Sequence, residues 1–202
     1  MKFKWPSRHS PSVTQAWLPS RSAESDITLD VAQLHDEYAE FVWRNLQRLG
    51  VRPSELEDAL QDVFMVVHRR LDSFDGSSKL STWLFGISLR VASSYRKRAF
   101  LKHEQGNLEF YETMDENPMS DPEEQAQRRE AERQLQESLE SMVLERRAVF
   151  VMFELEGLPT SAIADILGIP QGTVHSRLHK ARLEFTESIA RQDTTRKVGG
   201  VP

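Results

Sequence analysis

Apolar residues recur every three or four positions along most of the chain, which is the spacing of one buried face of an α-helix. The first such segment runs from Ile27 to Gly50 and the second from Arg52 to Leu71. A third extends from about Leu80 to Ala99. Glycine and proline fall between these segments, and the strict alternation typical of strands does not occur in the sequence. The pattern therefore predicts an all-α protein.

Helix boundaries are predicted by capping residues. Gly50 is a natural stop for the first helix. Ser54 followed by Glu57 forms a capping-box pattern and predicts the start of the second helix. Thr160 or Ser161 is the expected N-cap of a short helix later in the chain.

The second half of the chain repeats the helical spacing after an acidic interval. Helix resumes near Glu123, and it either continues or breaks once before the segment 144–157. Gly157 and Pro159 end that segment, a short helix follows, and the turn "GIPQ" leads into a last helix. We therefore expect two small helical domains, 27–103 and 128–191, joined by an acidic flexible linker over 104–127 and flanked by tails at 1–26 and 192–202.

Charge is segregated within a chain of 202 residues and net charge −5. Residues 85–103 hold five Lys or Arg and no acid, whereas residues 104–127 hold eight acids and no Lys or Arg. Blocks of opposite sign indicate surfaces with different partners.

Composition narrows the possible functions further. The absence of cysteine from the sequence excludes disulfides, Cys-type zinc sites and thiol catalysis. No apolar run approaches the ~20 residues that cross a bilayer, so we expect no direct membrane insertion. The N-terminus lacks the apolar region of a secretory signal, and we expect a cytoplasmic protein.

Two short helices joined by a glycine-containing turn, the second of them basic, form a helix-turn-helix pattern over 160–185. Ala164 and Gly168 are small where the two helices must approach. One apolar stripe of the second helix faces the core, and it is made by Val174, Leu178, Ala181 and Phe185. The other faces carry polar and basic side chains: Thr173, His175, Ser176, Arg177, His179, Lys180 and Arg182. Such a helix fits the DNA major groove, and the alternative is an ordinary solvated basic face.

The sequence gives less support to a metal site or a catalytic site than to the helix-turn-helix. His175 and His179 have the spacing of metal ligands, but no adjacent Glu or other ligand accompanies them, so no metal site is predicted. Asp58 and Asp62 lie one helical turn apart with Gln61 beside them, which suits either a solvated helix face or a docking face for a basic partner. The carboxylates lack a convergent partner set, and we expect no catalytic residue and no cofactor.

The segment "KLSTWLFGISLRVASSYRKR", residues 79–98, mixes aromatic and basic side chains. Proteins hold single-stranded DNA with such a combination, because the cations bind phosphates and the aromatic rings stack on bases. The alternative is that the aromatic residues Trp83, Phe85 and Tyr95 belong to the core.

Two blocks of the sequence resemble a known family. "LEDALQDVFMVVHRRLDSFDGSSKLSTWLFGISLRVASSYRKR" is similar to region 2 of bacterial extracytoplasmic-function sigma factors of the sigma-70 family. "LERRAVFVMFELEGLPTSAIADILGIPQGTVHSRLHKARLEF" is similar to their region 4. The resemblance covers about 27–103 and 135–188, and its most specific parts are the D-x-x-Q-(D/E)-V-F block and the G-T-V-x-S-R-L-x-x-A-R block.

The resemblance implies a transcription initiation factor that binds core RNA polymerase and directs promoter recognition and melting. The face with Asp58, Gln61 and Asp62 would bind the polymerase. Duplex DNA of the minus-thirty-five element would be read by the basic helix, with Arg177 and Arg182 in backbone and packing roles. The minus-ten element, including the melted non-template strand, would contact residues between positions 79 and 98: Lys79, Ser81, Thr82, Trp83, Arg90, Ser94, Tyr95, Arg96, Lys97 and Arg98. The acidic linker would occupy a basic channel of the polymerase.

An anti-sigma factor is a further partner that the resemblance implies.

The sequence departs from the family pattern at Arg90 and Ser94, where relatives often carry Asn and Asp. These two differences affect the preference for particular bases in the minus-ten element. Met142 and Val143 stand where many relatives have Leu-Pro, which predicts a more continuously helical entry to the second domain. Two competing hypotheses are a stand-alone helix-turn-helix regulator and, more remotely, a nuclease that uses Asp58 and Asp62.

Overall fold

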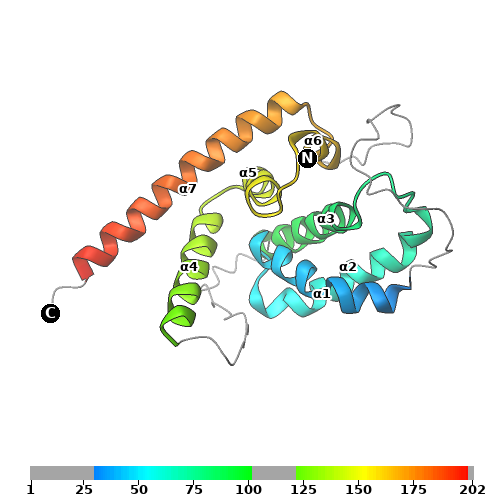
Figure 1. The fold of residues 1–202 in the computed structure, drawn as a ribbon, viewed down its shortest axis with the longest axis horizontal. Coiled ribbons are helices and arrows are strands. Elements are labelled where there is room, and N and C mark those ends of the chain that lie inside the picture. The colour runs from blue at the N-terminus through cyan, green and yellow to red at the C-terminus, as the bar shows by residue number, and fades with distance from the viewer. Residues whose placement is uncertain (1–29, 102–121, 200–202) are drawn as a thin grey trace.

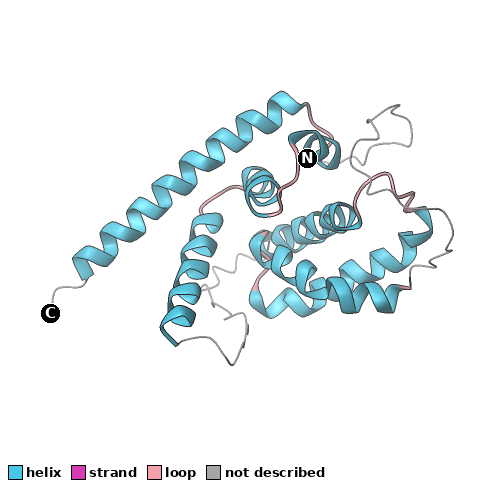
Figure 2. Ribbon diagram, in the orientation of Figure 1, coloured by secondary structure: helices cyan, strands magenta, loops and turns pink. Residues whose placement is uncertain are grey.

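The computed structural model describes residues 30–101 and 122–199. Within these ranges every regular element is helical (Figure 2), which confirms the predicted all-α class. The predicted N-terminal tail and positions 104–121 of the predicted linker lie outside the described residues. Positions 122–127, which we predicted to be linker, already belong to a helix.

The N-terminal unit consists of three helices, α1 (Val31–Arg48), α2 (Leu56–Arg70) and α3 (Leu80–Leu101). Two short 3₁₀ turns, η1 (Pro53–Glu55) and η2 (Leu71–Ser73), lie before and after α2. Asp30 caps α1, because its carboxylate accepts a hydrogen bond from the backbone N–H of Ala32 at 3.2 Å. The three periodic segments of the sequence thus become the three helices of this unit.

The C-terminal unit contains α4 (Pro122–Glu140), α5 (Leu144–Phe150), α6 (Thr160–Leu167) and α7 (Gln171–Gly199). A π-helical turn, η3 (Val151–Leu155), extends α5. The helix breaks at residues 141–143, where Val143 has extended backbone angles, so the prediction of a more continuous helix there is wrong. α7 continues to Gly199, beyond the boundary at residue 191 that the sequence predicted.

Two predicted N-caps are also wrong. Pro53 starts the η1 turn, so Ser54 lies inside that turn and α2 begins after Glu55, whose side chain makes no capping hydrogen bond to the described backbone. α6 begins after Pro159, whose side chain carries no acceptor, and Thr160 is already helical. In both places a proline with fixed φ sets the entry to the helix, and a polar cap is not needed.

Helix α3 lies in the middle of the molecule, between the α1–α2 pair and the segment α5–α6 (Figure 1). It is buried almost all round its central turns, and the buried positions are Thr82, Leu84, Phe85, Gly86, Ile87, Ser88 and Leu89. A helix that is apolar on every side needs cover on every side. The C-terminal unit supplies part of that cover, so the two units share one continuous hydrophobic core.

Candidate nucleic-acid interface

The turn between α6 and α7 is fixed by Gly168. This residue has φ 63° and ψ 40°, the left-handed conformation that glycine adopts without steric cost. The N–H of Ile169 donates to the carbonyl of Ala164 at 3.1 Å, and the N–H of Gly168 donates to the carbonyl of Asp165 at 3.3 Å. These two bonds form a Schellman motif, which ends α6 and turns the chain into α7. Gly168 is exposed, so its backbone conformation, rather than close helix packing, explains the glycine.

One face of α7 anchors it to the rest of the unit. Val174, Leu178 and Ala181 are buried, as the sequence predicted. Phe185 stacks on Phe150 of α5 with ring centroids 4.9 Å apart. Next to this stripe, Arg146 of α5 pairs with Glu184 at 2.7 Å. The helix is therefore held rigidly from its buried side, which leaves the opposite side available for a partner.

The polar side chains of α7 gather on the exposed side. Five predicted duplex-binding residues are exposed, and two are half-buried; the exposed ones are His175, Ser176, His179, Lys180 and Arg182, and the half-buried ones are Thr173 and Arg177. Arg182 is tied back to the π-helical turn, because its Nε donates to Glu154 at 2.6 Å and its guanidinium lies 5.3 Å from the ring centre of Phe153. Arg182 therefore contributes to the packing of α7 on η3. Lys180 is exposed on the same helix.

The predicted polymerase-binding residues lie together on α2 but differ in exposure. Asp58 and Gln61 are exposed, whereas Asp62 is half-buried. The carboxylate of Asp62 accepts a hydrogen bond from the hydroxyl of Tyr95 on α3 at 3.0 Å. Burial raises the pKa of Tyr95, and the bond to Asp62 raises it further, so this hydroxyl stays a donor at neutral pH. Asp62 thus joins two helices, and the freely available acid of this face is Asp58.

The predicted minus-ten residues fall into three groups along α3. Four are exposed, namely Lys79, Ser94, Lys97 and Arg98, and four are half-buried, namely Ser81, Trp83, Arg90 and Arg96. Thr82 and Tyr95 are buried, and Tyr95 carries the guanidinium of Arg98 over its ring at 4.1 Å. Trp83 packs against Phe74 with centroids 5.2 Å apart. Two cations, Lys97 and Arg98, are therefore exposed near the end of α3, and a third, Lys79, is exposed just before its start. Trp83 is the aromatic residue of segment 79–98 that is not buried.

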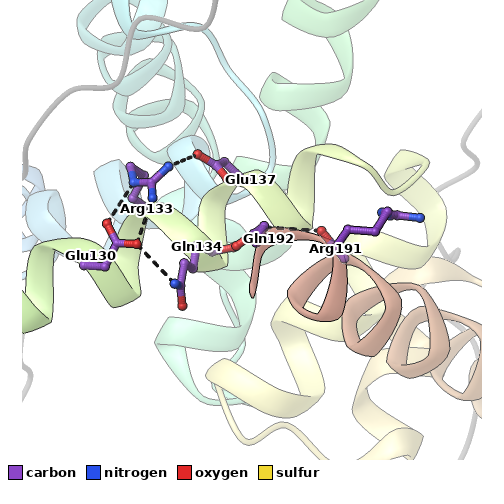
Figure 3. Close-up of a pocket in the computed structure, with 7 residues that line it drawn as sticks. Glu130, Arg133, Gln134, Glu137, Arg191 and Gln192 are labelled. Carbon is purple, nitrogen blue, oxygen red and sulfur yellow. Dashed lines mark hydrogen bonds and ion pairs between the residues drawn. The ribbon is translucent and has the colours of Figure 1, made fainter. Parts of the chain in front are cut away.

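A cavity of about 500 Å³ lies between α4 and the second half of α7 (Figure 3). Its lining is polar. Arg133 bridges Glu130 and Glu137 on α4, and the side chain of Gln192 on α7 donates to the carbonyl of Gln134 at 3.3 Å.

Within the described ranges no three His, Cys, Asp or Glu side chains converge to hold a metal ion. None of the helices described is both long and apolar enough to span a membrane.

The sequence did not single out Arg147. Its side chain is completely buried, and its Nε, Nη1 and Nη2 atoms have no hydrogen-bond partner among the described residues. Its position in the helical pattern offered a signal, because Arg147 directly precedes the buried residues Ala148 and Val149, and an arginine in a buried run is unexpected.

The comparisons with known proteins follow the same division of the chain. Residues 34–100 match the family model "Sigma-70 region 2", and residues 132–185 match "Sigma-70, region 4". The ECF RNA polymerase sigma-E factor of Escherichia coli (strain K12) is 30% identical over 140 residues, which cover 65% of this chain and 72% of that protein. The ECF RNA polymerase sigma factor SigE of Mycolicibacterium smegmatis is 27% identical over 183 residues, covering 87% and 70%.

A similar fold occurs in a solved complex, that of the sigma factor RpoE with the anti-sigma factor NepR from Bartonella quintana. The TM-score is 0.58 at 22% sequence identity, over 79% of this chain and 96% of that one. Both family models match in the order region 2 then region 4, on the helices that carry the candidate polymerase-binding and DNA-binding faces. The chain belongs to the extracytoplasmic-function RNA polymerase sigma factors of the sigma-70 family.

Proposed function

We propose that this sigma factor binds core RNA polymerase through α2, reads the minus-thirty-five element as duplex with α7, and engages the minus-ten element with α3. The observation that carries the proposal is the helix-turn-helix α6–α7, whose anchored helix presents His175, Ser176, His179 and Lys180 to solvent. A helix held in this way enters the major groove with its polar edge toward the bases.

The chain contributes no bond chemistry in this proposal, because the polymerase carries the active centre. Its contribution to melting is to capture bases that have left the stack. Opening costs roughly 1.4 kcal/mol for each base-pair step, and stacking of one base on an aromatic ring returns about 1–3 kcal/mol. Trp83 is half-buried against Phe74, and a base could cover its remaining exposed surface.

Two further partners belong to the proposal. The polymerase channel would accept the acidic linker, and an anti-sigma factor would hold the chain inactive. The similar structure of RpoE with NepR supports an anti-sigma partner by analogy of fold. A stand-alone helix-turn-helix regulator explains α6–α7 but leaves the region 2 unit without a role.

Transcription with purified core polymerase on a pool of genomic fragments tests the proposal. The chain should direct transcripts from a defined set of promoters, and alone it should bind the same duplexes weakly. Equally tight binding to duplex without polymerase, with no transcripts, would favour the stand-alone regulator.

The polymerase-binding face is tested by Asp58→Arg. We choose Asp58 because its carboxylate is exposed, whereas a change at Asp62 would also break the bond to Tyr95. Charge reversal in a protein interface costs several kcal/mol, so the affinity for core polymerase should fall at least about tenfold. The matched control is Asp72→Arg, the same change at an exposed acid in η2. Equal affinities for the two variants would show that the docking face is elsewhere.

A further inference from the structure

A second, smaller pocket opens between the loop after α1 and the last turns of α3. Its volume is about 300 Å³, at the small end of the range for small-molecule sites. Its lining includes Gly50, Arg52 and Glu55 on one side and Tyr95, Arg96 and Phe100 on the other. All six belong to the region 2 unit, so the walls of this pocket do not depend on the helix-turn-helix.

Arg96 gives this pocket a cation with unused donors. It is half-buried, and its guanidinium forms no hydrogen bond or ion pair with any residue that the structure describes. Burial lowers the pKa of Arg96, while Glu140 and Glu145 attract its charge without forming an ion pair and raise the pKa. A guanidinium has five N–H donors in a fixed fork that matches the oxygens of a phosphate group. Arg96 is therefore suited to bind an anion.

A second guanidinium lies directly behind the pocket wall. Arg147 of α5 is completely buried, and its three side-chain nitrogens have no hydrogen-bond partner among the described residues. A Cβ atom on Gly50 would be 2.2 Å from Nη1 of Arg147 and 2.2 Å from Nη1 of Arg96, so the glycine leaves room for both. Burial and then the charge of Arg96 lower the pKa of Arg147 to about 9, although Glu140 raises it. Both groups are charged at neutral pH, and an anion beside them would offset their repulsion.

An aromatic ring at the same pocket narrows the kind of anion. Phe100 is 79% exposed although it is apolar, and it lines the pocket together with Arg96. This combination suits a nucleotide, because arginine binds phosphate and a base can stack on the ring. The convex backbone of a DNA duplex would instead meet the fully exposed cations of α3, Lys97 and Arg98.

We propose that the pocket between the loop after α1 and the end of α3 binds a nucleotide, with the phosphates on Arg96 and Arg52 and the base on Phe100. Arg147 adds positive potential from behind the wall and does not touch the ligand. Glu55 is the acid of the lining, and its charge opposes binding. The proposal goes beyond the proposed function and does not rest on it, because it uses no contact with a promoter or with polymerase.

Calorimetric titration of the full chain with ATP tests the site. ATP should bind, adenosine should not because it has no phosphate, and pyrophosphate should bind more weakly than ATP because it has no base. Arg96→Met should weaken ATP binding at least about tenfold, the effect of losing a charge-assisted contact. Arg69→Met is the matched control, since it removes an exposed cation of α2 outside the pocket, and its affinity should stay at the parent value.

A change of the opposite sign keeps the test decisive if Arg96→Met is poorly folded, which melting curves would reveal. Glu55→Gln removes the negative charge of the lining, so ATP should bind more tightly than to the parent. A purely structural role of these side chains would not produce shifts in opposite directions. The absence of ATP binding to the parent would overturn the proposal, and so would equal affinities of folded parent, Arg96→Met and Glu55→Gln.

DNA carries the same phosphate group, and competition separates the two sources. A short single DNA strand should displace a fluorescent ATP analogue less well than unlabelled ATP does at equal phosphate concentration. Better displacement by the strand would make the pocket a DNA contact and would overturn the proposal of a nucleotide site. Neither experiment requires transcription, so failure of the proposed function would leave their results unchanged.

Discussion

At the scale of single residues, Arg147 is a cation that is completely buried where α5 approaches α1 and α3. Its guanidinium is buried without a hydrogen-bond partner among the described residues, beside the like charge of Arg96, and the charge of Glu140 offsets this only in part. A buried unpaired charge destabilises the state that buries it. In the sequence the one signal was the apolar run that follows Arg147, because the residues at the end of α1 and on α3 that lie against this side chain are far from it along the chain.

We expect Arg147→Met to stabilise the protein. The methionine fills similar space without a charge, and replacement of buried charge by apolar side chains has stabilised other proteins by about 1–4 kcal/mol. Arg146→Met is the control on the neighbouring position, where loss of the pair with Glu184 should cost up to ~1 kcal/mol. Urea unfolding followed by circular dichroism measures both. A larger loss for Arg147→Met than for Arg146→Met would show that Arg147 has a stabilising partner.

At the scale of elements, apolar periodicity predicted where the helices are and which face of each is buried. The stripe Val174, Leu178 and Ala181 is buried as expected. Helix caps were harder to predict. Pro53 begins η1 and Pro159 directly precedes α6, and neither proline has a side-chain acceptor. Ser54 and Thr160 therefore do not serve as the N-caps that the sequence predicted. The end of α7 was also missed, because its last turns lack an apolar stripe of their own.

Substitution by alanine should have different effects at two cationic residues of α7. Lys180 is exposed and free to reach a phosphate or a base edge, so Lys180→Ala should weaken duplex binding and reduce the salt slope by about one ion. Arg182 is paired with Glu154, so Arg182→Ala should mainly lower the melting temperature. Polymerase-dependent promoter binding at several salt concentrations, with melting curves alongside, separates the two effects. Equal changes in salt slope would contradict the assignment of Arg182 to packing.

At the scale of the whole molecule, sequence reasoning predicted two helical units but not their contact. The family models match the two parts separately, at residues 34–100 and 132–185. The contact uses Arg48, Glu156 and Arg147, which periodicity assigns to solvent-facing or unremarkable positions. The spacing of apolar residues in the sequence indicates which face of a helix is buried. An ion pair between distant helices depends on how the two units are placed, which that spacing does not indicate.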